Sequence, residues 1–433
     1  MSHMSQGKLA RSVSIISTAY SHIGDVRKTP QIKDLTEREL FAASCMEAMK
    51  KGNIRARDID AYYVGVSGPN FSQMKSAAAW FGTWIGMEDK PTLFHDEGCA
   101  TSVFGLEQAV LAVASGRYDT VLSGAVNINS CVQKPGMPPQ DRVKFDNDAL
   151  WASVYAATDT AYVRPGYGGV GPTEAVLASY AAKYGLAREQ IDDSYVGYLT
   201  SKRREALLNP RQTRVTMSYE DEAKAMGFDS VRDYLTSDVY NPYLGLLVRA
   251  QYLGQILDGS SAVIVCATDK AREYVEKPIE VAGVATIGIM DYEMAEFPFW
   301  GDELVFKRAY QMAGITDPAT QVDYLGVHDC PASMVLPVSE ESGYIPAGQA
   351  WKYAAEGEMA FDGAKPVTTS GGRTQSGHPR SPAFIIEVEE AMNQMRGENG
   401  ARQMPKAPKT SVVWGGGAGY NVGCCVLKSL GEE

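Results

Sequence analysis

The sequence predicts an α/β fold, and three observations support that prediction. Strand-like runs rich in Val, Ile and Tyr alternate with helix-like segments along most of the chain. The 433 residues are more than one small core usually organises, so two domains or two fused halves are expected. The same order of elements occurs on both sides of a central region of different composition, without obvious repetition of sequence. We therefore expect two similar α/β halves with an insertion between them.

The first half is expected to begin with a strand near Val13, followed by a helix over residues 37–50 and a strand over residues 61–67. Residues 106–115 are small or apolar on all sides, which is typical of a buried helix rather than an amphipathic one. A further strand is expected over residues 120–127. Strands and helices thus alternate as in a sheet covered by helices.

The central region, residues 131–239, is rich in Tyr, Pro, Asp and Arg and has few strand-like runs. We interpret it as an inserted, mostly helical lid. Its glycine-rich segment 166–171 is either a loop that closes over the bound ligand or an ordinary flexible loop.

The alternation of strands and helices resumes after the lid, with strand patterns at 258–267, 278–289 and 322–327 and a helix at 382–396. Two strand-like runs joined through glycines end the chain. The expected division is an N-terminal half of residues 8–130 with 240–270, a lid of residues 131–239, and a C-terminal half of residues 276–433.

Composition excludes several classes of function. The chain has 41 Lys and Arg against 52 Asp and Glu, a net charge of −11, which argues against a nucleic-acid surface because phosphates attract clustered basic residues. It has no apolar run of 18 or more residues, so no membrane span is expected, and its first four residues resemble a cloning remnant. The seven cysteines show neither zinc-ribbon spacing nor a disulfide framework, so no metal is expected and a reducing cytoplasm is the expected location.

Cys99 is the first candidate for chemistry. It lies in the segment His95-Asp-Glu-Gly-Cys-Ala-Thr-Ser102, after a polar turn and before the predicted buried helix. The free N–H groups and the positive end of a helix dipole favour a thiolate at that position. An isolated cysteine is more often a small buried core residue, so the assignment depends on its companions.

Two histidines supply those companions. His328 follows the predicted strand 324–327, and His378 lies in the glycine-rich segment 371–380. Each therefore follows a strand end or a turn, where α/β proteins present functional groups. A lone histidine in a loop is usually a surface residue, but a cysteine with two such histidines is typical of nucleophilic acyl transfer.

Several separate motifs resemble the thiolase superfamily, and most closely its branch related to sterol carrier protein x. They occur in the expected order and cover nearly the whole chain, and they are Gly98-Cys-Ala-Thr-Ser102, Asp258-Gly-Ser-Ser-Ala262, His328-Asp-Cys330, Gly377-His-Pro379 and Gln394-Met-Arg-Gly-Glu-Asn-Gly-Ala-Arg-Gln403. The resemblance implies a five-layered αβαβα fold from two similar halves, a homodimer within a larger assembly, and CoA and acyl-CoA as substrates with no permanently bound cofactor.

The resemblance also implies roles for individual residues. Cys99 would be acylated, and His378 would activate its thiol and help to hold a developing oxyanion. His328 takes the place of an asparagine found in many thiolases, which helps to bind the thioester oxygen. The backbone of Gly416 and Gly417 would approach the thioester closely. The implied reaction is cleavage of a 3-oxoacyl-CoA, as in β-oxidation, or the reverse Claisen condensation.

One departure from the family concerns the proton at the α carbon of the substrate. Many thiolases exchange it with a second cysteine in a Cys-x-Gly-Gly-Gly pattern, but here Val413 precedes Trp414 and the three glycines. His378, Cys330 or a bound water could take this role, and we favour His378. Cys424 and Cys425 lie in the last predicted strand, where a core position is expected.

Arg380 is a second departure, since the family more often has Leu at this position. It could bind a substrate carboxylate in a bidentate manner, or form a salt bridge that shapes its loop. A carboxylate clamp would suit a substrate from aromatic degradation such as benzoylsuccinyl-CoA, cleaved to benzoyl-CoA and succinyl-CoA.

Two other functions stay open. Some thiolase-like subunits perform retro-aldol cleavage, and others act as non-catalytic scaffolds, although retention of Cys99 and both histidines speaks against each. Relatives in this branch often work with a small zinc-ribbon and OB-fold protein, and this chain has no such segment of its own. We therefore expect a separate zinc-containing partner subunit.

Overall fold

The computed structural model describes residues 8–67, 77–132, 143–144, 170–288, 297–417 and 421–431. Its main sheet has the strand order β3-β2-β4-β7-β1-β8-β11-β10-β9. The two halves meet where β1 pairs with β8 through only two residue pairs, Ser14 with Glu280 and Ile15 with Ile279. A separate two-stranded ribbon joins β5 (Cys131–Val132) and β6 (Val143–Lys144).

The N-terminal half contributes a five-stranded part of the sheet. Strand β2 lies parallel to β3 and β4, whereas β7 runs antiparallel to both β4 and β1. These strands are β1 (Val13–Tyr20), β2 (Ala61–Gly65), β3 (Thr92–His95), β4 (Thr120–Asn127) and β7 (Gly259–Ala267). All but the edge strand β3 are fully buried, which explains their continuous apolar composition.

The C-terminal half contributes the other four strands. Strand β9 lies parallel to β10, and β11 runs antiparallel to β10 and β8. Their bounds are β8 (Ile279–Gly288), β9 (Tyr324–Val327), β10 (Thr410–Gly417) and β11 (Asn421–Ser429).

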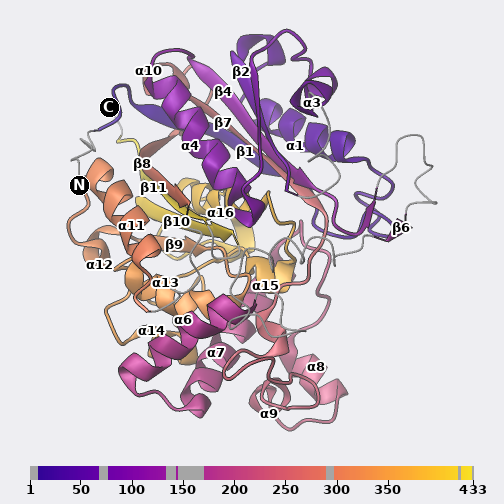
Figure 1. Cartoon of the computed structure of the whole chain (residues 1–433), viewed down its shortest axis with the longest axis vertical. Coiled ribbons are helices and arrows are strands. Elements are labelled where there is room, and N and C mark those ends of the chain that lie inside the picture. Colours follow the sequence, from indigo (N-terminus) through magenta and orange to yellow (C-terminus); the bar gives the residue numbers. More distant parts are fainter. Residues whose placement is uncertain are drawn as a thin grey trace.

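The helices form three layers around the two parts of the sheet. The outer N-terminal layer contains α1 (Glu37–Lys51) and α3 (Ala77–Ile85), and the central layer contains α4 (Thr101–Ala114) and α16 (Ala383–Arg396). The central helices contact strands of both halves, while α11 (Trp300–Ala313) covers β8 and β11 from the opposite side. The result is the αβαβα order that the resemblance implies, so the predicted fold is confirmed (Figure 1).

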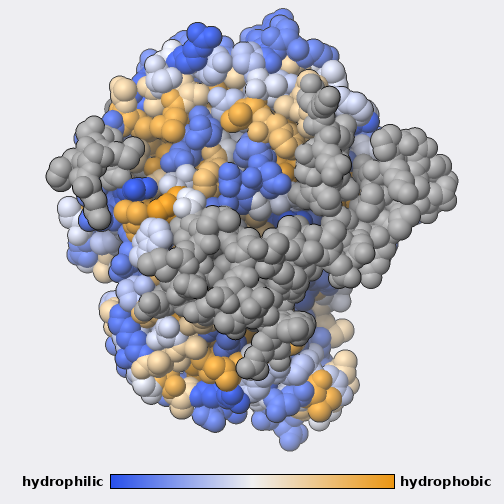
Figure 2. All heavy atoms as spheres, in the orientation of Figure 1, coloured by the Kyte–Doolittle hydropathy of each residue, from blue (hydrophilic) through white to orange (hydrophobic). Residues whose placement is uncertain are grey.

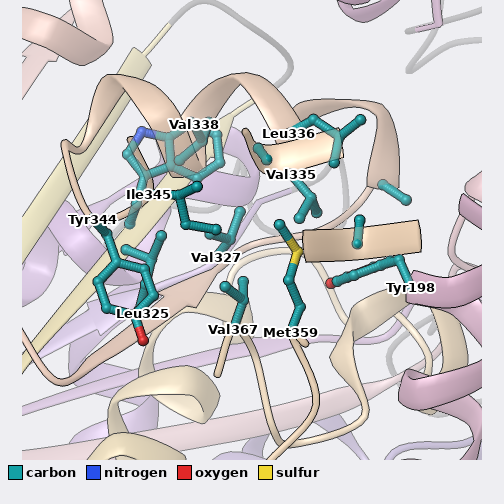
Figure 3. Packing of buried hydrophobic residues seen from close by; sticks show 14 of the residues in the cluster. Tyr198, Leu325, Val327, Val335, Leu336, Val338, Tyr344, Ile345, Met359 and Val367 are labelled. Atoms are coloured by element: carbon teal, nitrogen blue, oxygen red, sulfur yellow. The ribbon is translucent and has the colours of Figure 1, made fainter. Parts of the chain in front are cut away.

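Three hydrophobic cores lie between these layers. One lies between α1 and the N-terminal strands, a second surrounds α4 and α16, and the third joins the C-terminal strands to α11, α13 (Val335–Glu341) and the helices of the central region. Figure 3 shows part of the third core, where Val327 of β9 packs among Val335, Met359 and Val367 close to Tyr198. Strand β9 is therefore fixed directly before the loop that carries His328.

The predicted helix at 37–50 agrees closely with α1. Thr36 begins it with a capping box, since its hydroxyl accepts from the backbone N–H of Glu39 and the Glu39 carboxylate accepts from the backbone N–H of Thr36. The helix predicted at 106–115 begins earlier in the structure, at Thr101, two residues after Cys99.

The described part of region 131–239 is mostly helical. It contains α6 (Val170–Tyr184), α7 (Arg188–Leu208), α8 (Tyr219–Ala225) and α9 (Val231–Leu235), of which α7 to α9 lie at the end of the molecule remote from α3 (Figure 1). Helix α7 packs against α14 (Ala350–Ala355) and α15 (Gly372–Ser376). The lid function and the domain boundaries stay predictions. The remaining short helices are α10 (Thr268–Ala271) and α12 (Pro318–Gln321).

Among the described residues on the face shown in Figure 2, hydrophobic residues form several separate groups among hydrophilic ones. Among the described helices, none combines the length and the apolar composition that a bilayer crossing demands.

Candidate active site

Cys99 lies in a one-turn 3₁₀ helix, η2 (Gly98–Ala100), between β3 and α4. The Thr101 hydroxyl closes this turn, because it accepts from the Glu97 backbone N–H at 2.9 Å and donates to the Gly98 carbonyl at 2.6 Å. Gly98 has a φ of +59°, a backbone conformation that a β-carbon would strain. The turn therefore holds the Cys99 thiol at the beginning of α4.

The glycine loop after Trp414 packs against the same turn. A β-carbon on Gly417 would lie 2.8 Å from the Glu97 carbonyl oxygen, which is closer than real β-carbons come, and 3.1 Å from the Ala100 nitrogen, which is tight. Asn421, which follows the loop, donates from its amide to the Glu97 carboxylate at 2.8 Å. The backbone of Gly417 thus lies directly beside the Cys99 turn, and glycine is needed there for close approach.

His328 and His378 lie in direct contact. His328 follows β9, and its Nδ1 lies 3.0 Å from the carbonyl oxygen of Gly416. Its Nε2 lies 3.0 Å from Nε2 of His378, which is held by a backbone hydrogen bond to Gln255 of 2.8 Å. Two residues fifty positions apart therefore form one imidazole pair above the glycine loop.

The partners of the pair determine its protonation. A carbonyl oxygen only accepts, so Nδ1 of His328 carries the hydrogen and its neutral Nε2 is an acceptor. The hydrogen between the rings consequently belongs to Nε2 of His378. Burial lowers the pKa of His328 to about 4 and that of His378 well below its usual value, so both rings are neutral at pH 7.

Burial raises the pKa of the Cys99 thiol, and Asp96 raises it further, while the charge of Arg380 and a hydrogen bond from that side chain lower it. The helix end was expected to favour a thiolate, but the pKa of the Cys99 thiol is raised in the free protein. The cost of burying a charged sulfur outweighs the favourable effect of Arg380.

Arg380 lies beside Cys99 in an unusual backbone conformation. Its φ is +64°, its side chain is buried, and its Nη2 donates to the Ser67 hydroxyl at 3.1 Å. Within the described ranges it forms no ion pair, so the loop-shaping salt bridge is not among the interactions of this part of the chain.

Comparison with known proteins identifies the family. Residues 299–429 match the family model described as thiolase C-terminal domain-like. An acetyl-CoA acetyltransferase of Methanothermobacter thermautotrophicus is 25% identical over 405 residues, which cover 92% of this chain and 94% of that protein. These matches support the thiolase superfamily for this chain.

Shorter matches agree with the branch that the motifs indicate. Bovine sterol carrier protein 2 is 26% identical over 161 residues, covering 35% of this chain and 29% of that protein. Benzoylsuccinyl-CoA thiolase subunit BbsB of Thauera aromatica is 27% identical over 168 residues, covering 37% of this chain and 43% of that protein.

Solved structures share the thiolase fold over nearly the whole chain. The Ltp2-ChsH2(DUF35) aldolase superposes with a TM-score of 0.74 at 17% identity and covers 97% of this chain and 98% of that one. Human mitochondrial 3-ketoacyl-CoA thiolase superposes with a TM-score of 0.67, also at 17% identity, and covers 98% of this chain and 100% of that one.

Within this thiolase fold, Cys330 lies near Cys99. The charge of Cys99 contributes to raising the pKa of the Cys330 thiol, so the two sulfurs interact, and burial is the larger cause. Cys330 Sγ faces the Gly254 carbonyl oxygen at 3.9 Å, and a β-carbon on Gly254 would lie 3.0 Å from that sulfur. The sequence left proton exchange open between His378, Cys330 and a bound water and favoured His378, and this assignment stays a prediction.

Asp329 is a residue that the sequence interpretation missed. It is fully buried and accepts hydrogen bonds from Tyr198 at 2.9 Å, from the Thr374 hydroxyl at 2.8 Å and from the backbone N–H of Arg373. It thereby joins the His328 loop to α15, which leads to His378. Asp329 lies between His328 and Cys330 in the sequence motif, and this position was the signal that could have identified it.

Other candidates contribute nothing to the site. Cys424 and Cys425 are buried in β11, as a core position requires. The described residues hold no group of three His, Cys, Asp or Glu side chains placed to bind a metal ion. Most of the glycine-rich segment 166–171 lies outside the described residues.

Proposed function

We propose that this protein is a thiolase that cleaves a 3-oxoacyl-CoA with CoA, or runs the reverse Claisen condensation, through an acyl-Cys99 intermediate. The observation that carries the proposal is the arrangement of the Cys99 turn, the imidazole pair and the glycine loop at one place. A nucleophile, hydrogen-bond donors and closely approaching backbone are what acyl transfer requires.

In the cleavage direction, the Cys99 sulfur attacks the 3-oxo carbon of the substrate. The bond between Cα and Cβ breaks, and its electron pair moves into an enolate whose charge lies on the thioester oxygen. His378 is suited to donate its Nε2 hydrogen to that oxygen, since the hydrogen already points away from the ring into the shared space with His328.

The enolate must then gain a proton at the α carbon. We assign this step to Cys330, because its raised pKa keeps the thiol protonated and its sulfur lies near Cys99. His378 is less suited, since its hydrogen serves the oxygen atom. The Cys330 thiolate that this step leaves takes the thiol proton of the incoming CoA, and the CoA thiolate attacks the acyl group. Cys99 leaves as thiolate, and a shortened acyl-CoA is released. CoA thus enters as a substrate, and these steps require no permanently bound cofactor.

Benzoylsuccinyl-CoA is the substrate that we propose within this class. The partial similarity to BbsB supports it, and so does Arg380, a buried cation that could bind the substrate carboxylate. Comparing turnover of benzoylsuccinyl-CoA with that of acetoacetyl-CoA would test this choice, and faster turnover of acetoacetyl-CoA would contradict it.

Retro-aldol cleavage is the second candidate. It is favoured by the fold similarity to the Ltp2-ChsH2(DUF35) aldolase, whose TM-score of 0.74 exceeds the 0.67 of the human thiolase. An aldol cleavage forms no acyl-enzyme, so the state of Cys99 separates the two reactions. If the protein were a non-catalytic scaffold, the arrangement of Cys99, His328 and His378 would have no function.

Acylation of Cys99 decides between these functions. The protein would be incubated with 3-oxoacyl-CoAs and acyl-CoAs, digested, and analysed by mass for acyl groups on the Cys99 peptide, with the Cys330 peptide as internal control. We expect acyl-Cys99 in the wild type and none in Cys99→Ser. Wild-type turnover by Cys99→Ser would overturn the thiolase proposal.

We also propose a homodimer and a separate zinc-ribbon and OB-fold subunit. Strand β3 supports the dimer, because it is the edge of the sheet and exposes Thr92 and Leu93. The structure named for Ltp2 together with a DUF35 protein supports the partner. Mass measurement in solution tests the dimer, and full activity of the purified chain alone would contradict the need for a partner.

A further inference from the structure

Arg380 differs from the other buried arginines in lacking a carboxylate partner among the described residues. Arg249 pairs with Asp192 at 2.9 Å, Arg373 with Glu387 at 3.1 Å, and Arg402 with Glu390 at 2.8 Å. Arg380 is only 8% exposed, yet its Nη2 donates to the Ser67 hydroxyl at 3.1 Å instead, and its charge lowers the pKa of the Cys99 thiol. A buried cation is costly unless it is paired, so the groups that Arg380 does face in the described part of the chain are informative about its role.

The surroundings of Arg380 fix the direction of its guanidinium. Its φ of +64° is rare for a residue with a β-carbon, so the backbone is held by its neighbours. Asn127, at the end of β4, accepts from the backbone N–H of Ser381 at 3.2 Å and donates to the Ser67 carbonyl. One amide thus ties together the residue that follows Arg380 and the residue that receives its hydrogen bond.

We propose that Arg380 is a further catalytic residue, whose guanidinium stabilises the negative charge of the Cys99 sulfur whenever that sulfur is a thiolate. The inference rests on the proposed function, since it requires Cys99 to be the nucleophile. Arg380 would thus act on the reacting Cys99 sulfur itself, in addition to any contact with the substrate.

The catalytic cycle needs such a charge at two points. Before acylation, the Cys99 thiol releases its proton to a solvent base, and the sulfur then forms the S–C bond while its charge passes to the leaving enolate. After CoA thiolate attacks the acyl group, the S–C bond breaks and Cys99 again carries the charge. Arg380 stabilises the attacking and the departing thiolate alike.

The imidazole pair of His328 and His378 is poorly suited to stabilise the Cys99 thiolate alone. His378 shares its Nε2 hydrogen with His328, and its pKa lies well below the usual value, which makes it a weak base. Among the described residues, Cys330 from the loop after β9 stays a neutral thiol, because burial and the charge of Cys99 raise its pKa. Asp96 from the preceding turn opposes a thiolate at Cys99. Arg380 is the group that favours it.

The pH dependence of Cys99 alkylation tests the proposal. The full chain would be treated with iodoacetamide from about pH 6 to about pH 11, and the modified Cys99 peptide quantified by mass. We expect Arg380→Met to move the midpoint upward by about one pH unit or more, which is about tenfold slower alkylation at a given pH below it. Arg380→Lys should move it less, because it keeps the charge.

Arg117→Met is the matched control, since Arg117 is exposed and its loss changes the net charge equally. Its profile should equal that of the wild type. If Arg380→Met fails to fold, the alkylation midpoints of Ser67→Ala and Arg380→Lys test the proposal instead. Ser67→Ala is suitable because it removes only the hydrogen bond that orients the guanidinium.

An unchanged midpoint in the Arg380 variants would overturn the proposal. The midpoint could stay unchanged while the KM for carboxylate-bearing acyl-CoAs rises and that for other acyl-CoAs does not. In that case Arg380 only binds the substrate carboxylate, and the proposal is wrong. Alkylation is measured without turnover, so its outcome is independent of the acylation experiment, whose failure would instead overturn the thiolase assignment.

Discussion

The Nε2 atoms of His328 and His378 lie 3.0 Å apart, and a single hydrogen lies between them. Because Nδ1 of His328 donates to Gly416, that ring can only accept at Nε2 while it is neutral. The two imidazoles therefore act as one unit, in which His328 orients the hydrogen that His378 carries. A substrate oxygen that enters this space competes with His328 for the hydrogen.

We expect His378→Ala and His328→Ala each to lower kcat by about 10²- to 10³-fold, the usual cost of losing one oxyanion donor. The double variant should lose little more than either single variant, because the residues share one hydrogen bond. Steady-state kinetics of all three variants measures this coupling. Multiplicative losses in the double variant would contradict the view that the pair acts as a unit.

Cys330→Ser should slow protonation of the enolate at its α carbon, and with it overall turnover, by about 10²-fold or more, because a hydroxyl is a much weaker acid than a thiol. Alkylation of Cys99 should remain near the wild-type rate, since Cys330 stays a neutral thiol while Cys99 ionises. Exchange of the α-carbon proton of an acyl-CoA with D₂O, followed by NMR, measures the affected step directly. Wild-type exchange in Cys330→Ser would return the role to His378 or to a bound water.

The sequence predicted most of the fold and the three central residues, because local patterns carry that information. Strand and helix periods predicted the α/β alternation, and Cys99, His328 and His378 each follow a strand end or turn that the pattern marks. The start of α4 was misplaced, because its first turn carries no apolar period of its own. The contacts between distant segments could not be predicted. Neither the partner of Arg380 nor the approach of Gly417 to Ala100 leaves a local signal.

Asp302 and Glu341 should make the stability of the fold depend on pH. Both carboxyls are enclosed, and Asp302 accepts from Trp414 at 2.7 Å while Glu341 accepts from the backbone of Phe299 at 2.6 Å. Burial raises the pKa of Asp302 from 3.8 to about 7, and burial beside Asp302 raises that of Glu341 well above 4.5. The folded state therefore holds protons that the unfolded chain releases.

Because these pKa values are raised on folding, the contribution of the pair is full below about pH 4 and is lost as the pH rises through 7 and above. Asp302→Asn should flatten this dependence, since its amide oxygen still accepts from Trp414 and its amide needs no proton. Urea unfolding at acidic, neutral and alkaline pH measures the slope, with exposed Glu398→Gln as control. A slope equal to that of the wild type in Asp302→Asn would refute the assignment.

Gly417 offers the most direct test of how the glycine loop supports the nucleophile. In Gly417→Ala, the new methyl group would lie 2.2 Å from the Asn421 side-chain oxygen and 2.8 Å from the Glu97 carbonyl oxygen. The first contact can relax, because it involves a side chain, but the second is with backbone of the turn that carries Cys99. The turn must move, so we expect a loss of stability of about 1 to 3 kcal/mol and a larger loss of activity.

The double variant Gly417→Ala with Asn421→Ala separates these two effects. Removing the Asn421 side chain relieves the closest contact and should recover part of the melting temperature, whereas kcat should stay low because the backbone contact at Glu97 persists. Gly288→Ala is the matched control, since Gly288 ends a strand of the same sheet and a β-carbon there meets nothing within 4 Å. If activity returned together with stability in the double variant, the close approach of Gly417 would serve the fold alone and not the position of Cys99.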